Sequence, residues 1–133
     1  MRALVDTCIW SCVLRYKEPD IEHGKKLADL INDGRAAIIG PIRQEILSGI
    51  SSKTQFLKLK NALSSFEDIQ LKTEHFEKAA EFCNICRNNG IQGSTIDFLI
   101  CAVAFLEKLV IFTSDGDFIN YSKFLPIELL QVI

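Results

Sequence analysis

Short apolar runs alternate with longer amphipathic stretches along the whole chain. Residues 3–5, 36–39 and 109–112 each form a run that predicts a β-strand. Weaker runs predict a strand near residues 69–71 and an edge strand at residues 128–133. Uninterrupted, β-branched runs are typical of strands that are buried on both faces of a parallel sheet. The pattern therefore predicts an α/β domain with a mostly parallel central sheet.

Helical periodicity fills the intervals between these strands. One helix is expected to begin after Thr7, and the others cover residues 20–33, 41–47, 53–66, 74–88 and 95–106. Thr7 is suited to cap the first helix, and Gly34 is suited to end the second in a left-handed conformation. The last of these helices is apolar on almost every face, which predicts that it is buried.

Composition indicates one globular domain, spanning residues 1–133, in a reducing compartment. This length fits a single core, and 48% of the residues are hydrophobic. The five cysteines are odd in number and lack a disulfide-like spacing, which predicts a cytoplasmic location. No apolar run suits a secretory leader or a membrane span. The formal net charge of −2 argues against purely electrostatic binding to nucleic acid.

Acidic residues follow the predicted strands at one end. Asp6 directly follows the first strand, and Asp115 and Asp117 follow the strand at residues 109–112. Parallel strands end at the same edge of a sheet, and open α/β sheets bind their ligands beyond that edge. We therefore expect these three carboxylates to converge, although they are far apart in the sequence.

Two helices are expected to add one carboxylate each. Glu45 has Ile42 and Gly49 as its neighbours at i−3 and i+4, so we expect it to face the apolar side of its helix. Asp97 lies in the first turn of the helix that is predicted to be buried. Because an unpaired buried carboxylate is costly, Asp97 requires a partner, and a cation would supply one.

A divalent cation would relieve the repulsion among these acids. Carboxylates that face one another repel, and their pKa values rise. Mg²⁺ prefers oxygen ligands, and Mn²⁺ suits the same set. One or two such ions can activate water for in-line attack on phosphorus and neutralise the leaving oxygen. The predicted metal ligands are Asp6, Glu45, Asp97, Asp115 and Asp117.

Four motifs together resemble those of the PIN-domain family, particularly the VapC-type toxins of bacterial and archaeal toxin–antitoxin pairs. The motifs are Leu4-Val5-Asp6-Thr7, Arg43-Gln44-Glu45-Ile46, the segment 97–104, and Thr113-Ser114-Asp115-Gly116-Asp117-Phe118. They follow the family's order and spacing over the whole chain. The resemblance implies a three-layer α/β/α fold.

The resemblance also implies an activity and partners. It implies an endoribonuclease that uses Mg²⁺ or Mn²⁺, a cognate antitoxin that blocks the site, and often a homodimer. The catalytic acids that it implies are Asp6, Glu45, Asp97 and Asp115. Asp117 matches an extra ligand or a supporting group, and Thr7 and Thr113 match hydroxyl positions that support the acids. Cys8 departs from the family, whose members more often carry a small polar residue there, which puts a water-mediated contact in doubt.

Structural roles offer an alternative for each of the acids. Asp6 is a favoured helix cap, and Glu45 can be an ordinary solvated glutamate of its helix. Asp97 can complete a capping box with Ser94. Asp115 and Asp117 can form a turn around the glycine between them. At the level of the whole protein, two other functions remain open. One is a non-catalytic PIN-like module that binds RNA or protein, and the other is a receiver-type signalling domain, which also gathers acids at strand ends.

Other chemistry is less well supported by the sequence. Cys83 and Cys86 have the spacing of a zinc knuckle, but a second pair is lacking, so core packing is the preferred interpretation. His23 and His75 lie near no nucleophile elbow, which argues against a serine hydrolase. Arg43 shares a helix with one of the acids and is a candidate for contact with RNA phosphate.

Overall fold

Three parallel strands form the centre of the computed structural model, which describes residues 1–14 and 21–131. The strands are β1 (Ala3–Val5), β2 (Ala36–Ala37) and β3 (Val110–Phe112). Their order in the sheet is β2-β1-β3, and Leu4 of the central strand pairs with Ala37 on one side and Ile111 on the other. The predicted parallel sheet is thus confirmed.

Beyond the three strands, one isolated β-bridge forms at each outer edge of the sheet. Ile38 bridges to Asp68 and Ile111 bridges to Leu129, both in parallel orientation. The two weaker predicted strands therefore reduce to one bridge each. Residues 132–133, at the end of the second of them, lie outside the described part of the chain.

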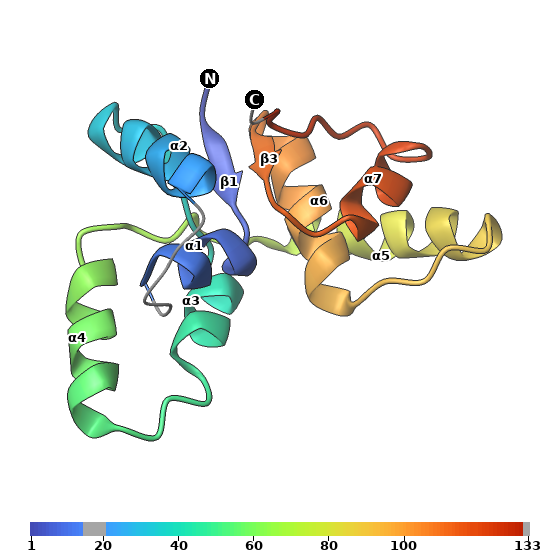
Figure 1. Ribbon diagram of the computed structural model, residues 1–133. Coiled ribbons are helices and arrows are strands. Elements are labelled where there is room, and N and C mark those ends of the chain that lie inside the picture. Colours follow the sequence, from blue (N-terminus) through green and yellow to red (C-terminus); the bar gives the residue numbers. More distant parts are fainter. Residues whose placement is uncertain (15–20, 132–133) are drawn as a thin grey trace.

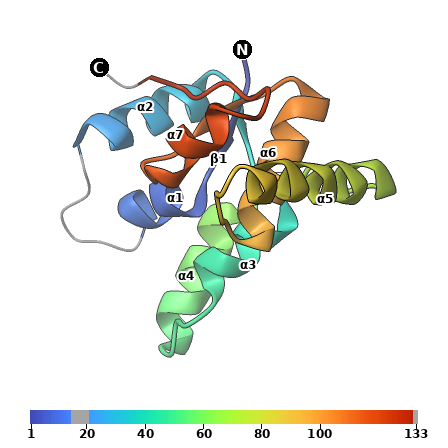
Figure 2. The ribbon, with the colours of Figure 1, turned by 90° about the vertical axis from the view of Figure 1, so that its right-hand side faces the viewer.

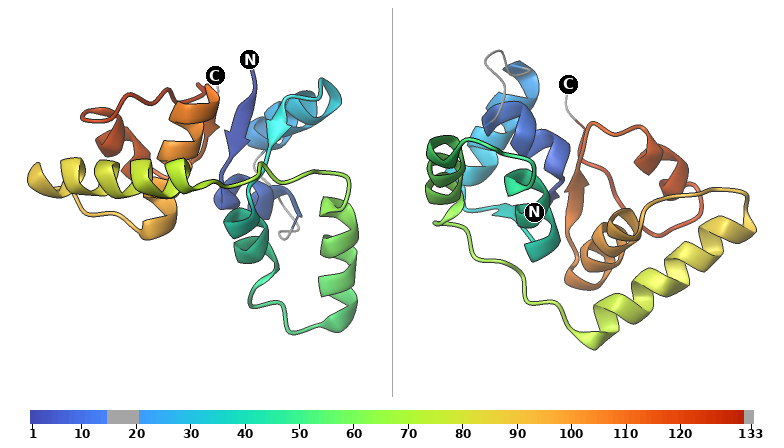
Figure 3. Two further views of the ribbon diagram at one scale, coloured as in Figure 1. Left: turned by 180° about the vertical axis from the view of Figure 1, so that it is seen from behind. Right: turned by 90° about the horizontal axis from the view of Figure 1, so that it is seen from below.

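Helices cover both faces of this small sheet. Within the described residues they are α1 (Thr7–Leu14), α2 (Ile21–Asn32), α3 (Gly40–Leu47), α4 (Lys53–Leu63), α5 (Thr73–Asn88), α6 (Thr95–Glu107) and α7 (Asp117–Ser122). The strands lie between α1 and α2 on one side and α5 and α6 on the other (Figures 1 and 3). This arrangement gives the predicted three-layer α/β/α fold, with α3 and α4 side by side at one end of the molecule (Figure 1).

Helix α6 supplies much of the hydrophobic core. Every residue from Phe98 to Ala104 is buried, as expected for a helix that is apolar on almost all faces. The helix packs against α5, which crosses it in Figure 2, and against β3. Because α6 is held between β3 and α5, the position of Asp97 in its first turn is fixed relative to the end of β3.

No helix in the described parts of the chain is long and apolar enough to cross a lipid bilayer.

The start of α1 differs from the sequence-based expectation. Asp6, rather than Thr7, is the residue that precedes the helix, because its main-chain oxygen accepts from the N–H groups of Ile9 and Trp10. Its side-chain Oδ1 also accepts from Thr7 N at 2.8 Å. Thr7 is the first helical residue and does not cap the helix. The helix therefore starts from the same acid that ends β1.

A buried histidine connects the start of α5 to the end of α6. His75 is fully buried, and its Nδ1 accepts from Lys72 N at 2.9 Å. Because Nδ1 is an acceptor, Nε2 carries a proton and donates to Glu107 Oε1, 2.9 Å away. The imidazole therefore satisfies a main-chain donor and holds the two helices together.

We expect His75→Ala to lower the free energy of unfolding by roughly 2–4 kcal/mol, because it leaves a cavity and removes the acceptor for Lys72 N. His75→Asn, which retains a side-chain acceptor near that donor, should lose less. Urea denaturation of the three proteins at pH 7 measures both changes. A loss below about 0.5 kcal/mol for His75→Ala would show that the imidazole does not hold the helices together.

Candidate metal centre

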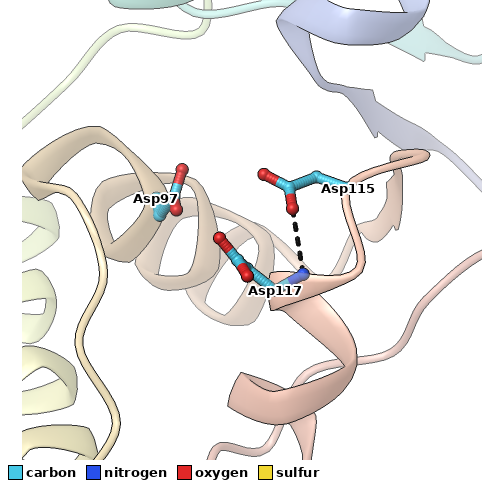
Figure 4. A group of neighbouring side chains, drawn as sticks. All are labelled: Asp97, Asp115 and Asp117. Atoms are coloured by element: carbon cyan, nitrogen blue, oxygen red, sulfur yellow. Dashed lines mark hydrogen bonds between the residues drawn. The ribbon is translucent and has the colours of Figure 1, made fainter.

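Three carboxylates come together beside the ends of β3 and α6. Asp97 lies in the first turn of α6, Asp115 follows β3, and Asp117 is the first residue of α7. One oxygen atom from each carboxylate lies within 4.8 Å of the other two (Figure 4). Asp115 Oδ1 accepts from Asp117 N at 2.9 Å, so the loop turns back and carries both acids to the same side as Asp97.

Asp6 lies at the end of β1 and is only 8% exposed. Its Oδ1 accepts from Thr7 N at 2.8 Å, and its Oδ2 accepts from Thr113 Oγ1 at 2.8 Å and from the Cys8 thiol at 3.6 Å. Burial raises the pKa of Asp6 above its ordinary value, the three hydrogen bonds oppose that rise, and the charge of Asp97 adds to it. Asp6 is thus close enough to Asp97 for the two carboxylates to repel each other.

Glu45 is exposed on α3, so the expectation that it faces the apolar side of the helix is wrong. Partial burial of its carboxyl nevertheless raises its pKa, and the charges of Asp6 and Asp97 raise it further. The nearby Thr7 hydroxyl lowers this pKa. That hydroxyl is buried and lacks a partner at hydrogen-bond distance among the described residues. Glu45 therefore borders the other acids from the solvent side.

Asp97 is common to two groups of acids. With Asp115 and Asp117 it forms the tight cluster, and with Asp6 and Glu45 it interacts through charge. The structure thus brings the five predicted acids to one edge of the sheet, although Asp6 and Glu45 lie outside the tight cluster.

Thr113 connects the end of β1 to the acidic turn after β3. Its hydroxyl donates to Asp6 Oδ2 at 2.8 Å and accepts from Asp115 N at 3.0 Å. Cys8 lies beside it, and its sulfur accepts from Ser114 N at 3.4 Å and from Ser114 Oγ at 3.2 Å. The thiol thus occupies a hydrogen-bonding position between the two segments, where a small polar residue was expected from the family.

Tyr121 is the residue of this site that the sequence reasoning missed. It is buried in α7, and its hydroxyl donates to Asp97 Oδ2 at 2.7 Å. Ser94 Oγ accepts from Asp97 N at 3.0 Å, but the Asp97 side chain bonds to Tyr121 and not back to Ser94, so the expected capping box is only half formed. The one signal in the sequence is that Tyr121 follows Asp117 by one helical turn.

Arg43 is used inside the protein. Its Nε lies 3.0 Å from Asp68 Oδ1, and its two terminal nitrogens donate to the main-chain oxygens of Leu63 and Phe66 at 2.9 and 2.6 Å. These bonds fasten α3 to the segment that follows α4. They argue against Arg43 as a candidate for contact with RNA phosphate.

The donor set fits a hard divalent cation. The cluster offers only carboxylate oxygens, the ligands that Mg²⁺ and Mn²⁺ prefer. Asp6 and Glu45 have raised pKa values because burial and neighbouring acids disfavour their charged forms. A bound cation would reverse that preference, since it supplies the largest local charge of opposite sign.

Comparison with known proteins identifies the fold. A family model described as PIN domain matches residues 3–123. Similar solved structures include FitAcB from Neisseria gonorrhoeae, with 17% identity over 97% of this chain and 96% of that chain, at a TM-score of 0.79. VapBC2 from Rickettsia felis, bound to a DNA fragment from its promoter, has 21% identity over 98% of both chains and a TM-score of 0.78.

A third similar structure is VapBC-5 from Mycobacterium tuberculosis, a member of the VapBC family of toxin–antitoxin systems. Its identity is 17% over 99% of this chain and 100% of that chain, at a TM-score of 0.70. No curated protein matches the chain in sequence. At these identities the solved structures show the shared fold.

We expect the carboxyl of Asp6 to make wild-type stability fall as the pH rises in the presence of EDTA. Its pKa is raised on folding, so its contribution is fully present below its ordinary value of 3.8 and is lost as the pH rises through the folded value. Asp6→Asn removes this titration. The free energy of unfolding of the variant, relative to wild type, should therefore increase between pH 4 and pH 7.

Urea denaturation across that pH range measures this difference. Asp33→Asn is the matched control. Asp33 is an exposed acid that pairs with Arg35 and does not belong to the site. A difference between Asp6→Asn and wild type that stays constant with pH would show that burial does not disfavour the charged Asp6.

Proposed function

The chain belongs to the PIN-domain family, and from this premise we propose that it is a metal-dependent endoribonuclease, the toxin of a toxin–antitoxin pair. The observation that carries the proposal is the meeting of carboxylates from three distant segments at one sheet edge. Oxygen atoms of Asp97, Asp115 and Asp117 lie within 4.8 Å of one another, and Asp6 interacts with Asp97 through charge. A structural role for each acid alone does not account for placing so much negative charge together.

In this proposal four acids hold and orient the catalytic metal. They are Asp6, Glu45, Asp97 and Asp115. Asp117 is a fifth candidate ligand, because its carboxylate belongs to the tight cluster. A bound Mg²⁺ or Mn²⁺ would supply an activated water molecule and would neutralise charge on the phosphate.

The chain's own residues then have separate tasks. The hydroxyl of Thr113 and the N–H of Thr7 hold the Asp6 carboxylate in a fixed orientation. Glu45 is exposed on α3, which leaves its carboxylate accessible to an incoming substrate. Burial and the charges of Asp6 and Asp97 raise its pKa in the metal-free protein, and a bound cation would favour the charged form that ligates the metal.

A hydrolytic mechanism through water fits the remaining side chains. His75 is fully buried between α5 and α6, away from the acids. The Cys8 thiol is engaged with Ser114 and Asp6. The family relationship supports RNA as the substrate, and the carboxylate site supports cleavage of a phosphodiester.

Similar structures support the proposed partners. VapBC-5 is a member of a toxin–antitoxin family, and VapBC2 was crystallised with DNA of its promoter. By analogy we propose a cognate antitoxin that covers the acidic edge, and assembly of this chain as a homodimer. The protein has five cysteines, an odd number without a disulfide-like spacing, which supports a cytoplasmic location, where thiols stay reduced.

The two competing functions are not equally supported. A receiver-type domain is disfavoured, because residues 3–123 match the PIN model. A non-catalytic PIN-like module that binds RNA or protein is the remaining alternative. The presence of all five acids at the site favours the nuclease.

We expect the purified protein to cleave total RNA with Mg²⁺ or Mn²⁺ and to stop when EDTA is added. Asp97→Asn should lower the rate by at least about 100-fold, because Asp97 is shared by both groups of acids and one ligand charge is lost. Asp29→Asn, which removes an exposed acid of α2, is the matched control and should cleave at the wild-type rate. Gel analysis of the RNA after incubation measures all four conditions.

Equal cleavage by wild type and Asp97→Asn would assign the activity to a contaminating nuclease. If wild type binds Mn²⁺ and RNA but cleaves no RNA, the non-catalytic module is the better description. Growth arrest on expression without cleavage of total RNA would point to a narrow RNA target, and cellular RNA should then be probed directly.

A further inference from the structure

The Tyr121 phenol is buried directly behind the acidic cluster. Its ring packs against Phe98 of α6 and Phe118 of α7, with ring centroids 5.2 and 5.1 Å apart. This packing directs the hydroxyl at Asp97, where it donates to Oδ2 at 2.7 Å. A phenylalanine would keep the same ring contacts, so hydrophobic packing alone does not require the hydroxyl.

Gly93 makes room for this phenol. A Cβ atom at Gly93 would lie 2.8 Å from Tyr121 Cζ and 2.9 Å from Phe98 Cζ, and it would also collide with the Tyr121 hydroxyl. These distances are too short for real atoms, so any larger residue would displace the ring. The backbone before α6 is thus shaped around a tyrosine in this position.

The hydrogen bond connects the two elements that carry the three clustered acids. Asp97 belongs to α6, whereas Asp115 precedes α7 and Asp117 begins it. Tyr121 follows Asp117 by one turn of α7 and reaches across to Asp97. Within the described residues, this is the one hydrogen bond between α6 and α7. Together with the packing of Tyr121 on Phe98, it fixes how the Asp97 carboxylate faces the start of α7.

Burial and the neighbouring acids keep the Tyr121 hydroxyl protonated. Burial raises the pKa of the Tyr121 phenol, and the bond to Asp97 and the charges of Asp97, Asp117 and Asp115 raise it further. The phenol therefore keeps its proton and remains a hydrogen-bond donor. A hydrogen bond from a neutral donor to a carboxylate is stronger than one between neutral groups. Among the described side chains, Tyr121 is the one that donates to Asp97.

We propose that Tyr121 is a positioning residue for the metal centre. It holds one oxygen of Asp97, so that the carboxylate is oriented toward Asp115 and Asp117 before a cation arrives. Groups of this kind, which act on a metal ligand from behind, commonly change metal affinity by tenfold or more when removed. The proposal rests on the metal site of the proposed function. It adds a residue that belongs to none of the four motifs.

Tyr121→Phe tests the proposal, because it removes the hydroxyl and keeps the ring. We expect the dissociation constant for Mn²⁺, measured by electron paramagnetic resonance without RNA, to rise roughly tenfold. The Mn²⁺ concentration for half-maximal cleavage should rise by a similar factor, while the rate at saturating Mn²⁺ changes much less. Ser122→Ala is the matched control. It removes a hydroxyl from the same helix that donates only to Ile119 O, so its Mn²⁺ affinity should equal that of wild type.

The outcomes separate this proposal from the proposed function. If wild type binds no Mn²⁺, the metal site fails, and the positioning role fails with it. If wild type binds Mn²⁺ and folded Tyr121→Phe binds it equally well, the metal site stands and the positioning role of Tyr121 is wrong.

A second measurement uses the wild-type protein and does not depend on the folding of a variant. The hydroxyl proton of Tyr121 should be observable by NMR as a slowly exchanging resonance, since the group is buried and hydrogen-bonded. We expect this resonance to shift when Mg²⁺ is added, because the ion withdraws charge from Asp97. A resonance that does not move at a saturating Mg²⁺ concentration would overturn the proposal.

Discussion

Repulsion among carboxylates at one edge of a three-stranded sheet is the constraint on which the rest of the site depends. Asp97 forms a tight cluster with Asp115 and Asp117, and its negative charge also acts on Asp6 and Glu45. Burial and this charge raise the pKa values of Asp6 and Glu45. A fold that keeps such a cluster must oppose the repulsion with other interactions. It does so by holding the acids from behind with hydroxyl and N–H donors.

Those donors come from the same segments that carry the acids. Thr113 donates to Asp6 and accepts from the main chain at Asp115, so the ends of β1 and β3 are tied together at the site. Tyr121 performs the corresponding task between α6 and α7. The parallel sheet sets which segments meet, and these side-chain hydrogen bonds set how their carboxylates face one another.

Much of this arrangement can be predicted from simple sequence patterns. The two strongest apolar runs, before Asp6 and Asp115, predict parallel strands, and parallel strands place the residues after their carboxyl ends at one edge of the sheet. The helix that contains Asp97 is apolar enough to require burial, and burial brings its lone early charge toward the same edge. Periodicity and strand topology are therefore enough to predict the parallel sheet and the meeting of the acids. The motifs shared with the family predict the three layers.

Other features depend on contacts that periodicity does not report. Helix α7 has only six residues, too few to show an amphipathic pattern, so Tyr121 was not recognised. The exposure of Glu45 depends on which elements pack against α3, and its neighbours at i−3 and i+4 do not determine that packing. Arg43 is committed to Asp68, 25 residues away, and no local signal marks that pairing.

Calorimetric titration of Mg²⁺ into the wild-type protein, repeated in buffers of different ionisation enthalpy, tests the central claim most directly. If the acids repel one another and hold protons at raised pKa values, binding must release protons at mildly acidic pH, and the release must fall toward zero as the pH rises above neutrality. Binding with no proton release at any pH, or no binding of Mg²⁺ or Mn²⁺ at all, would contradict the account.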